Sequence, residues 1–189
     1  MTRWGGFPEE HLAALGAHLQ VAGRSLRLLV VGGAAMRMRG VIPRATQDVD
    51  VLAMVDDGGH VELPQLTWLR PLVLRVARDF AVPDDWLNTE VAMQWQTGLP
   101  PEPLRDVVWR SFGALEVGLA GRQLLVTLKL FAACDHSPAS VHCQDLIALA
   151  PSAPELARAR EWVVTQDASE AWPGIVDQVM AHVQAQRPS

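Results

Sequence analysis

The chain has 189 residues, of which 49% are hydrophobic and 20% charged, and its formal net charge is −5. This balance predicts a globular fold with one core, and it excludes a disordered chain and a protein that binds nucleic acid through overall positive charge. The two cysteines exclude a disulfide framework and favour the cytoplasm, and the lack of a long apolar run excludes a membrane-spanning helix.

Strands alternate with helices over the first two thirds of the chain. Apolar residues at helical spacing predict helices, while short apolar or alternating runs that end at glycine predict strands. The expected elements, in chain order, are a helix over residues 8–22, a buried strand over 26–31, a short helix over 34–40, a strand over 46–55, a turn over 56–60, a long helix over 63–80 that Pro71 kinks or splits, a helix capped by Asp84 or Asp85, and one or two strands over 107–120 with a bend at Gly113.

The last third of the chain is predicted to be helical. The expected helices cover residues 121–133, 139–149, 154–165 and 168–186. The expected fold class is therefore α/β (α+β), with a small mixed sheet flanked by helices and a helical C-terminal part. We expect a core over residues 1–120, with the helical part over residues 121–189 packed on it.

Asp48 and Asp50 lie two residues apart in the segment TQDVDVLAMV, so their side chains share one face of the predicted strand. Two like charges that are buried without partners are costly, and the usual remedies are a metal ion or a nearby Arg or Lys. Mg²⁺ prefers carboxylate oxygens together with substrate phosphates. Gly32 and Gly33 allow a backbone to approach a phosphate at the start of a helix. Together these residues predict a nucleoside triphosphate (NTP) site.

Residues 30–52, VVGGAAMRMRGVIPRATQDVDVL, resemble the core motif of the DNA polymerase β-like nucleotidyltransferase superfamily. The forms Gly-Gly-x-Ala and Arg-x-Thr-x-Asp-x-Asp are most similar to the AbiEii-type and related minimal nucleotidyltransferases, a group that includes toxins of toxin–antitoxin modules. Residues 124–149, LLVTLKLFAACDHSPASVHCQDLIAL, are similar to later helices of that group, with Lys129 and Asp145 at the positions of its Lys and Asp. The segment DDWLN, residues 84–88, is a further point of resemblance to uncharacterised members.

The resemblance implies an enzyme that uses Mg²⁺ (or Mn²⁺) to move a nucleoside monophosphate from an NTP to an acceptor. The acceptor is an RNA end such as that of tRNA, a protein or a small molecule, and a cognate toxin–antitoxin partner is implied as well. Asp48 and Asp50 are expected to hold the metal ion, with Glu116 as the candidate third carboxylate. Asp145 is expected to orient Lys129 or to assist the acceptor. The residues assigned to nucleotide binding are Gly32, Gly33, Arg44, Thr46 and Lys129.

Several of these assignments have alternatives that the sequence leaves open. Arg44 either neutralises phosphate or pairs with one of the two aspartates, and Thr46 either contributes to the site or fills a strand position. Asp106 is the alternative third carboxylate. Asp145 either belongs to the site, caps a helix or pairs with Lys129.

The sequence departs from the family pattern in two places. Gly33 stands where the Gly-Ser form has a serine that touches a phosphate, and residues 135–148 contain no Arg or Lys where the pattern has a basic patch. The second departure favours an inactive member that binds nucleotide or a cognate partner, and a protein with purely structural ion pairs is a third interpretation. Residues 134–143 also carry two Cys and two His, residue types that can bind zinc. Their spacing matches no compact zinc-finger pattern, so the favoured interpretation is that these side chains share no metal ion.

Overall fold

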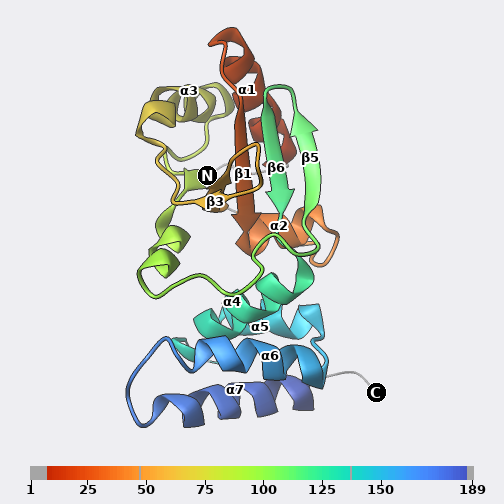
Figure 1. Ribbon diagram of the computed structural model, residues 1–189. Coiled ribbons are helices and arrows are strands. Elements are labelled where there is room, and N and C mark those ends of the chain that lie inside the picture. The colour runs from red at the N-terminus through yellow and green to blue at the C-terminus, as the bar shows by residue number, and fades with distance from the viewer. Residues whose placement is uncertain (1–7, 47, 137, 187–189) are drawn as a thin grey trace. The chain divides into compact units, whose positions relative to one another are not determined.

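The computed structural model describes residues 8–46, 48–136 and 138–186 (Figure 1). Contacts within the chain divide it into two compact units. The sheet unit runs up to residue 99 and includes residues 106–120, whereas the helical unit is built from residues 100–105 and from 121 onward. The predicted class, a mixed sheet flanked by helices with a helical C-terminal part, is confirmed.

The sheet unit contains a mixed sheet in the order β3-β2-β1-β6-β5, and the short strand β4 pairs with β2 outside this path. The strands are β1 (Leu26–Val31), β2 (Val49–Val55), β3 (Val61–Glu62), β4 (Leu87–Asn88), β5 (Val108–Phe112) and β6 (Leu115–Leu119). The central strand β1 pairs with β2 in the antiparallel sense and with β6 in the parallel sense, and all of its residues but Arg27 are buried. The predicted buried strand over residues 26–31 is therefore confirmed.

Helices α1 (Pro8–Val21) and α2 (Gly32–Met38) lie behind the strands β1, β6 and β5 in the view of Figure 1, and both contact the sheet. Gly16 allows the close approach of α1, because a Cβ atom at this position would overlap the backbone carbonyl of Phe112. The side chain of Arg110 on β5 donates a hydrogen bond to the carbonyl of Met38 at 2.7 Å and so ties the edge strand to the end of α2.

Two expected elements in the middle of the chain differ from those found. The helix predicted over residues 63–80 begins only at Arg70, as α3 (Arg70–Phe80), after a 3-10 turn over Thr67–Leu69. Pro71 lies in the first turn of α3, where its missing N–H leaves no helical hydrogen bond unmade.

The helix expected after a cap at Asp84 or Asp85 is also wrong. The segment forms β4, and a 3-10 helix, η2 (Glu90–Gln96), begins only after Thr89. Trp86 explains this path, because its indole is 1% exposed and donates to the carbonyl of Val73 at 3.1 Å. Burying this large side chain holds the segment extended beside β2.

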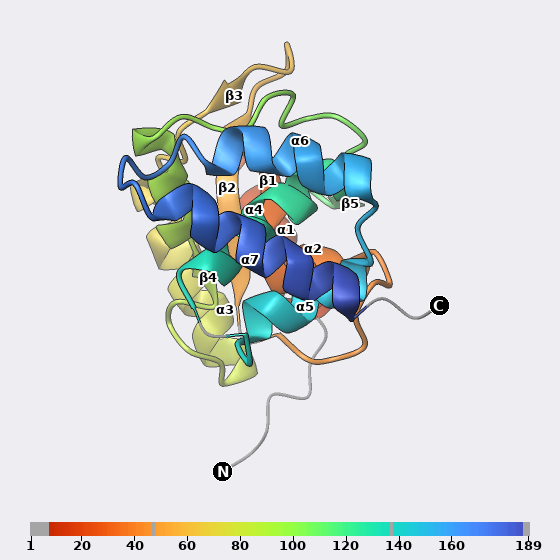
Figure 2. The ribbon, with the colours of Figure 1, turned by 90° about the horizontal axis from the view of Figure 1, so that it is seen from below.

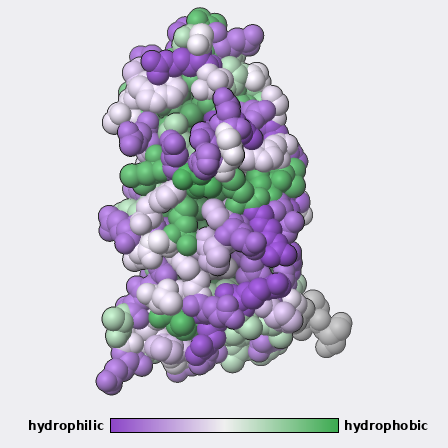
Figure 3. Space-filling model, in the orientation of Figure 1, coloured by the Kyte–Doolittle hydropathy of each residue, from purple (hydrophilic) through white to green (hydrophobic). Residues whose placement is uncertain are grey.

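The front of the sheet unit carries apolar surface. In Figure 3 hydrophobic surface gathers in a band across the sheet unit, over β3 and the strands beside it. Two half-exposed side chains of this unit are Leu63, at 50% exposure, and Val108 on the edge strand, at 45%. None of the helices in the described ranges is both long and apolar enough to cross a bilayer.

The helical unit consists of four helices in its described part: α4 (Arg122–Cys134), α5 (Val141–Leu149), α6 (Ala153–Val163) and α7 (Trp172–Ala185). Helix α4 contacts the other three, and Figure 2 shows α6 and α7 side by side in front of it. The ring of Phe131 lies edge-on to Trp162 and Trp172, with centroids 5.8 and 6.0 Å away. Aromatic pairs at this spacing and angle stabilise a core beyond their buried area. The four helices predicted from residue 121 onward are confirmed within a few residues at their ends.

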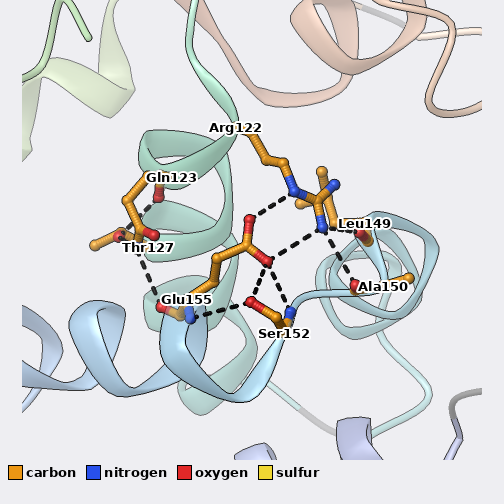
Figure 4. Close-up of polar contacts among 7 residues, drawn as sticks. All are labelled: Arg122, Gln123, Thr127, Leu149, Ala150, Ser152 and Glu155. Carbon is orange, nitrogen blue, oxygen red and sulfur yellow. Dashed lines mark hydrogen bonds and ion pairs between the residues drawn. The ribbon is translucent and has the colours of Figure 1, made fainter. Parts of the chain in front are cut away.

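A polar cluster ties three of these helices together (Figure 4). The carboxylate of Glu155 accepts hydrogen bonds from the backbone N–H and the hydroxyl of Ser152, both at 2.7 Å, which forms a capping box at the start of α6. It also accepts from Nε of Arg122 at 2.6 Å. Arg122 in turn donates to the carbonyls of Leu149 and Ala150 at the end of α5. One carboxylate therefore anchors the starts of α4 and α6 and, through Arg122, the end of α5.

The pKa of Glu155 reflects this cluster. Burial is the largest influence and raises the pKa, but the hydrogen bonds from Arg122 and Ser152 together lower it from 4.5 to about 2. A carboxyl whose pKa is lower in the folded state stabilises the fold fully above its unfolded pKa. That contribution is lost as the pH falls from about 4.5 towards 2.

We predict that Glu155→Gln lowers the free energy of unfolding by about 1–2 kcal/mol at pH 7, because it removes the charge from the cap and from the Arg122 pair. The difference from the wild type should shrink between pH 4.5 and 2, where Glu155 itself becomes protonated. Denaturant unfolding across this pH range measures the effect. Asp177→Asn, which removes an ion pair to Arg160 from a side chain that is 55% exposed, is the control and should change little. A loss for Glu155→Gln that is the same at every pH would contradict the assignment.

Candidate functional site

Asp48 and Asp50 are brought together by the side chain of Asn88. Its Nδ2 donates to Oδ2 of Asp48 at 2.9 Å and to Oδ1 of Asp50 at 3.1 Å. Strand pairing sets this arrangement, because β4 runs parallel to β2 with Asn88 opposite Asp50 and Leu87 opposite Val49. All three polar side chains are half-buried. The structure thus brings the two carboxylates to one side chain, although the strand expected over residues 46–55 begins only at Val49, so that Asp48 directly precedes β2 and residue 47 lies outside the described residues.

Gly32 lies directly against Asp50, one member of this pair. It follows β1, whose last residue Val31 stands opposite Asp50, and it opens α2 with a positive φ of +67°. A Cβ atom on Gly32 would overlap Oδ2 of Asp50. Glycine is therefore required twice here, once for the left-handed backbone and once for the contact with the carboxylate.

The loop before β2 covers Gly33. A Cβ atom at this position would lie 2.8 Å from Cγ2 of Thr46 and 3.5 Å from Nη2 of Arg44. The guanidinium of Arg37 on α2 holds the loop from behind, donating to the carbonyls of Pro43 at 2.6 Å and Arg44 at 2.9 Å. Thr46 is 8% exposed. The predicted residues Gly32, Gly33, Arg44 and Thr46 therefore gather at the junction of β1, α2 and β2.

Glu116 does not join this group. It lies on β6 opposite Arg27 and pairs with Nε of that residue at 2.7 Å. Asp50 lies opposite Val31, four residues further along β1, which corresponds to about 13 Å of strand. The expectation that Glu116 is a third ligand beside the aspartates is therefore wrong. In the described part of the chain no three His, Cys, Asp or Glu side chains, Asp106 included, form a group that could hold a metal ion.

Asn88 is the residue that sequence reasoning did not assign. The pattern DDWLN was noticed for its resemblance, yet it gave no role to the asparagine. A strand of two residues has no periodicity that could predict its pairing. Only the position of β4 beside β2 reveals that an amide, and not a third carboxylate, adjoins the pair.

Lys129 and Asp145 form a buried ion pair in the helical unit. Nζ of Lys129 lies 2.7 Å from Oδ2 of Asp145, and the two side chains are 9% and 2% exposed. Asp145 lies inside α5, whose N-cap is Ser140, so the helix-cap alternative for Asp145 is wrong and the pairing alternative holds. The expected contact of Lys129 with a triphosphate stays a prediction.

The Cys and His residues near the end of α4 do not gather as a metal site in the described part of the chain. The rings of His136 and His142 lie 4.8 Å apart, and Cys134 and Cys143 are both free thiols. Burial, with smaller contributions from Asp135 and Cys143, raises the pKa of Cys134 to about 12. Zinc binds the thiolate form, so this environment disfavours the zinc interpretation.

Comparison with known proteins adds no assignment, since no family model, curated protein or solved structure matches the chain. The comparisons therefore identify no family. What stands is a mixed α/β fold with C-terminal helices and a carboxylate pair that Asn88 and Gly32 enclose.

We predict that Gly32→Ala destabilises the protein more than Gly23→Ala does. Both glycines have a positive φ, +67° and +64°, so the backbone strain of an alanine is matched, but the space around Gly23 is open. The additional loss at Gly32, about 1–3 kcal/mol by thermal or denaturant unfolding, measures the contact with Asp50. Equal losses for the two variants would show that Asp50 does not approach Gly32 in solution.

We predict that Lys129→Met lowers the free energy of unfolding by about 3–5 kcal/mol, because it leaves the buried Asp145 carboxylate without its cation. Adding Asp145→Asn should recover a large part of that loss, since no buried charge then remains. Denaturant unfolding of the two single variants and the double variant measures the coupling. Additive losses, with no recovery in the double variant, would contradict a structural role for the pair.

Proposed function

We propose that the protein is a Mg²⁺-dependent nucleotidyltransferase that moves a nucleoside monophosphate from an NTP to an acceptor, as the resemblance of residues 30–52 implies. One observation carries this proposal: Asn88 holds Asp48 and Asp50 side by side, and Asp50 lies against the backbone of Gly32.

The donor set fits a divalent ion of the Mg²⁺ type. Asp48 and Asp50 would hold the ion through carboxylate oxygens, which are the hard ligands that Mg²⁺ prefers, and such sites draw the remaining ligands from phosphates and water. The overlap that a Cβ on Gly32 would make with Asp50 supports this fit, because it means that the backbone lies against the carboxylate with no side chain between them. Once bound, the ion supplies a Lewis acid that neutralises charge on the phosphates.

In this proposal the phosphates of the nucleotide are bound by residues next to the carboxylate pair. Helix α2 has only seven residues, so its dipole contributes little, and phosphate recognition falls on Arg44 together with the glycine backbone. Nη2 of Arg44 lies near Gly33, where it can neutralise a phosphate that approaches the glycines. Arg37 contributes indirectly by fixing the loop that carries Arg44.

In the reaction that we propose, an acceptor hydroxyl forms a bond to the α-phosphorus while the bond from that phosphorus to the β-phosphate oxygen breaks. The hydroxyl proton passes to water, and pyrophosphate leaves. The acceptor is an RNA end such as that of tRNA, a protein side chain or a small molecule. The resemblance to the AbiEii-type group further suggests a cytoplasmic protein with a cognate toxin–antitoxin partner.

The second candidate function is a catalytically inactive module that binds nucleotide or a partner protein. Two observations favour it. Residues 135–148 contain no Arg or Lys, and the charge of Lys129 is already satisfied by the buried Asp145. Residues 135–148 therefore lack the basic patch that would bind a triphosphate in the family pattern, and Lys129 is already paired with Asp145.

The test is transfer of label from α-labelled ATP, CTP, GTP and UTP, each with Mg²⁺ or Mn²⁺, to total RNA and to the protein itself. We expect transfer by the wild type and none by Asp48→Ala with Asp50→Ala. Asp57→Ala, at an exposed position of the neighbouring turn, is the control and should transfer normally. The labelled species identifies the acceptor.

Two results would change the proposal. Metal-dependent nucleotide binding without transfer, lost in the double variant, would establish the binding module instead. Neither transfer nor binding of any nucleotide, with all variants folded by their melting curves, would exclude the enzyme and the nucleotide-binding module, and would leave a partner-binding module or a structural role for the aspartates.

A further inference from the structure

We propose that Asn88 couples the metal ion to the nucleotide: with this amide beside Asp48 and Asp50, the site takes its divalent ion only together with a nucleotide. This inference rests on the proposed function, because it concerns the same carboxylates. Asn88 is a positioning residue in this account, since it acts on the two aspartates and not on the substrate.

Hydrogen bonds at both the oxygen and the nitrogen of the Asn88 amide fix its orientation. Oδ1 of Asn88 accepts a hydrogen bond from the backbone N–H of Glu90 at 3.2 Å. The NH₂ group consequently faces the carboxylates, and its two N–H bonds reach Asp48 and Asp50. Asn88 therefore serves the pair as a double donor, whereas its oxygen is engaged elsewhere and is not offered to a cation.

These two hydrogen bonds stabilise the ion-free state. They offset part of the repulsion between the aspartates, as a cation would, and they occupy Oδ2 of Asp48 and Oδ1 of Asp50. A divalent ion gains less when the carboxylates that it would neutralise are already held by donors. The neutral amide also leaves the site with two negative charges where a third carboxylate would give three, and affinity for a divalent cation rises with the number of charged ligands.

The phosphates of an NTP supply the missing negative charge and oxygen ligands. Oδ2 of Asp50 is the oxygen that faces Gly32, so the carboxylate presents one oxygen to the strand-helix junction where the glycines admit the phosphates. The bound ion then increases the affinity for the nucleotide, and the bound nucleotide increases the affinity for the ion. By thermodynamic linkage the two affinities change by the same factor.

The experiment is titration of the full chain with Mn²⁺, by calorimetry, with and without a non-transferable ATP analogue, for the wild type, Asn88→Asp and Gln96→Glu. The last variant adds the same charge at an exposed position of η2 and is the control. For the wild type and the control we expect at least about ten-fold tighter Mn²⁺ binding in the presence of the analogue. Asn88→Asp should bind Mn²⁺ alone at least about ten-fold more tightly than the wild type and depend less on the analogue.

Melting curves give a second readout that does not depend on calorimetry. In EDTA, Asn88→Asp should melt below the wild type, because three carboxylates repel, and Mn²⁺ should reverse the difference. Asn88→Ala removes the donors without adding charge, and it should show a larger rise in melting temperature with Mn²⁺ than the wild type does.

The outcomes separate this inference from the proposed function. If the analogue binds to no variant, the proposed function fails. If the analogue binds and Mn²⁺ affinity is the same in the wild type and Asn88→Asp, the inference fails while the proposed function stands. Wild-type Mn²⁺ affinity that is unchanged by a bound analogue would also overturn the inference.

Discussion

The repulsion between Asp48 and Asp50 is the constraint around which the sheet unit is organised. Two carboxylates at this spacing need donors or a cation, and the fold supplies donors from a strand 38 residues away from Asp50. The short β4 exists in this position because Trp86 is buried beside it. Asp50 also restricts the residue at the start of α2, because only glycine fits at position 32. The hydrophobic core and the polar site are therefore set by the same few residues.

The helical unit solves a comparable problem by direct pairing. There the carboxylates of Asp145 and Glu155 each meet a full cation, Lys129 and Arg122 respectively. The Lys129–Asp145 pair, which is almost fully buried, depends strongly on both partners, since either charge alone is costly there. The two units thus use different partners for their carboxylates: a lysine and an arginine in the helical unit, and the amide of Asn88 beside Asp48 and Asp50 in the sheet unit.

Much of the fold could be predicted because its longer elements repeat a regular pattern. The helical spacing of apolar residues revealed α1 and α4, and the alternation around Asp48 and Asp50 revealed β2. Patterns of this kind record which side chains are buried, but they carry no information on which distant segments pair. For that reason β4 was missed, and with it the role of Asn88.

The error at Glu116 has the same origin. An acidic residue in a strand is compatible with a metal ligand until strand register is known, and register places Glu116 beside Arg27. Register depends on the packing of the entire sheet, which no local stretch of sequence specifies. The position of Gly32 and Gly33 could be predicted from the sequence, because a glycine pair between a buried strand and a helix has few structural explanations.

The contact between Gly33 and Thr46 has a consequence for how this protein can diverge. A serine at residue 33 would bring its Cβ within 2.8 Å of Cγ2 of Thr46, in a loop whose neighbouring carbonyls are held by Arg37. The loop has little freedom to retreat, so the two positions are tied. Serine at residue 33 would therefore require the side chain of Thr46 to move or to be replaced by a smaller one.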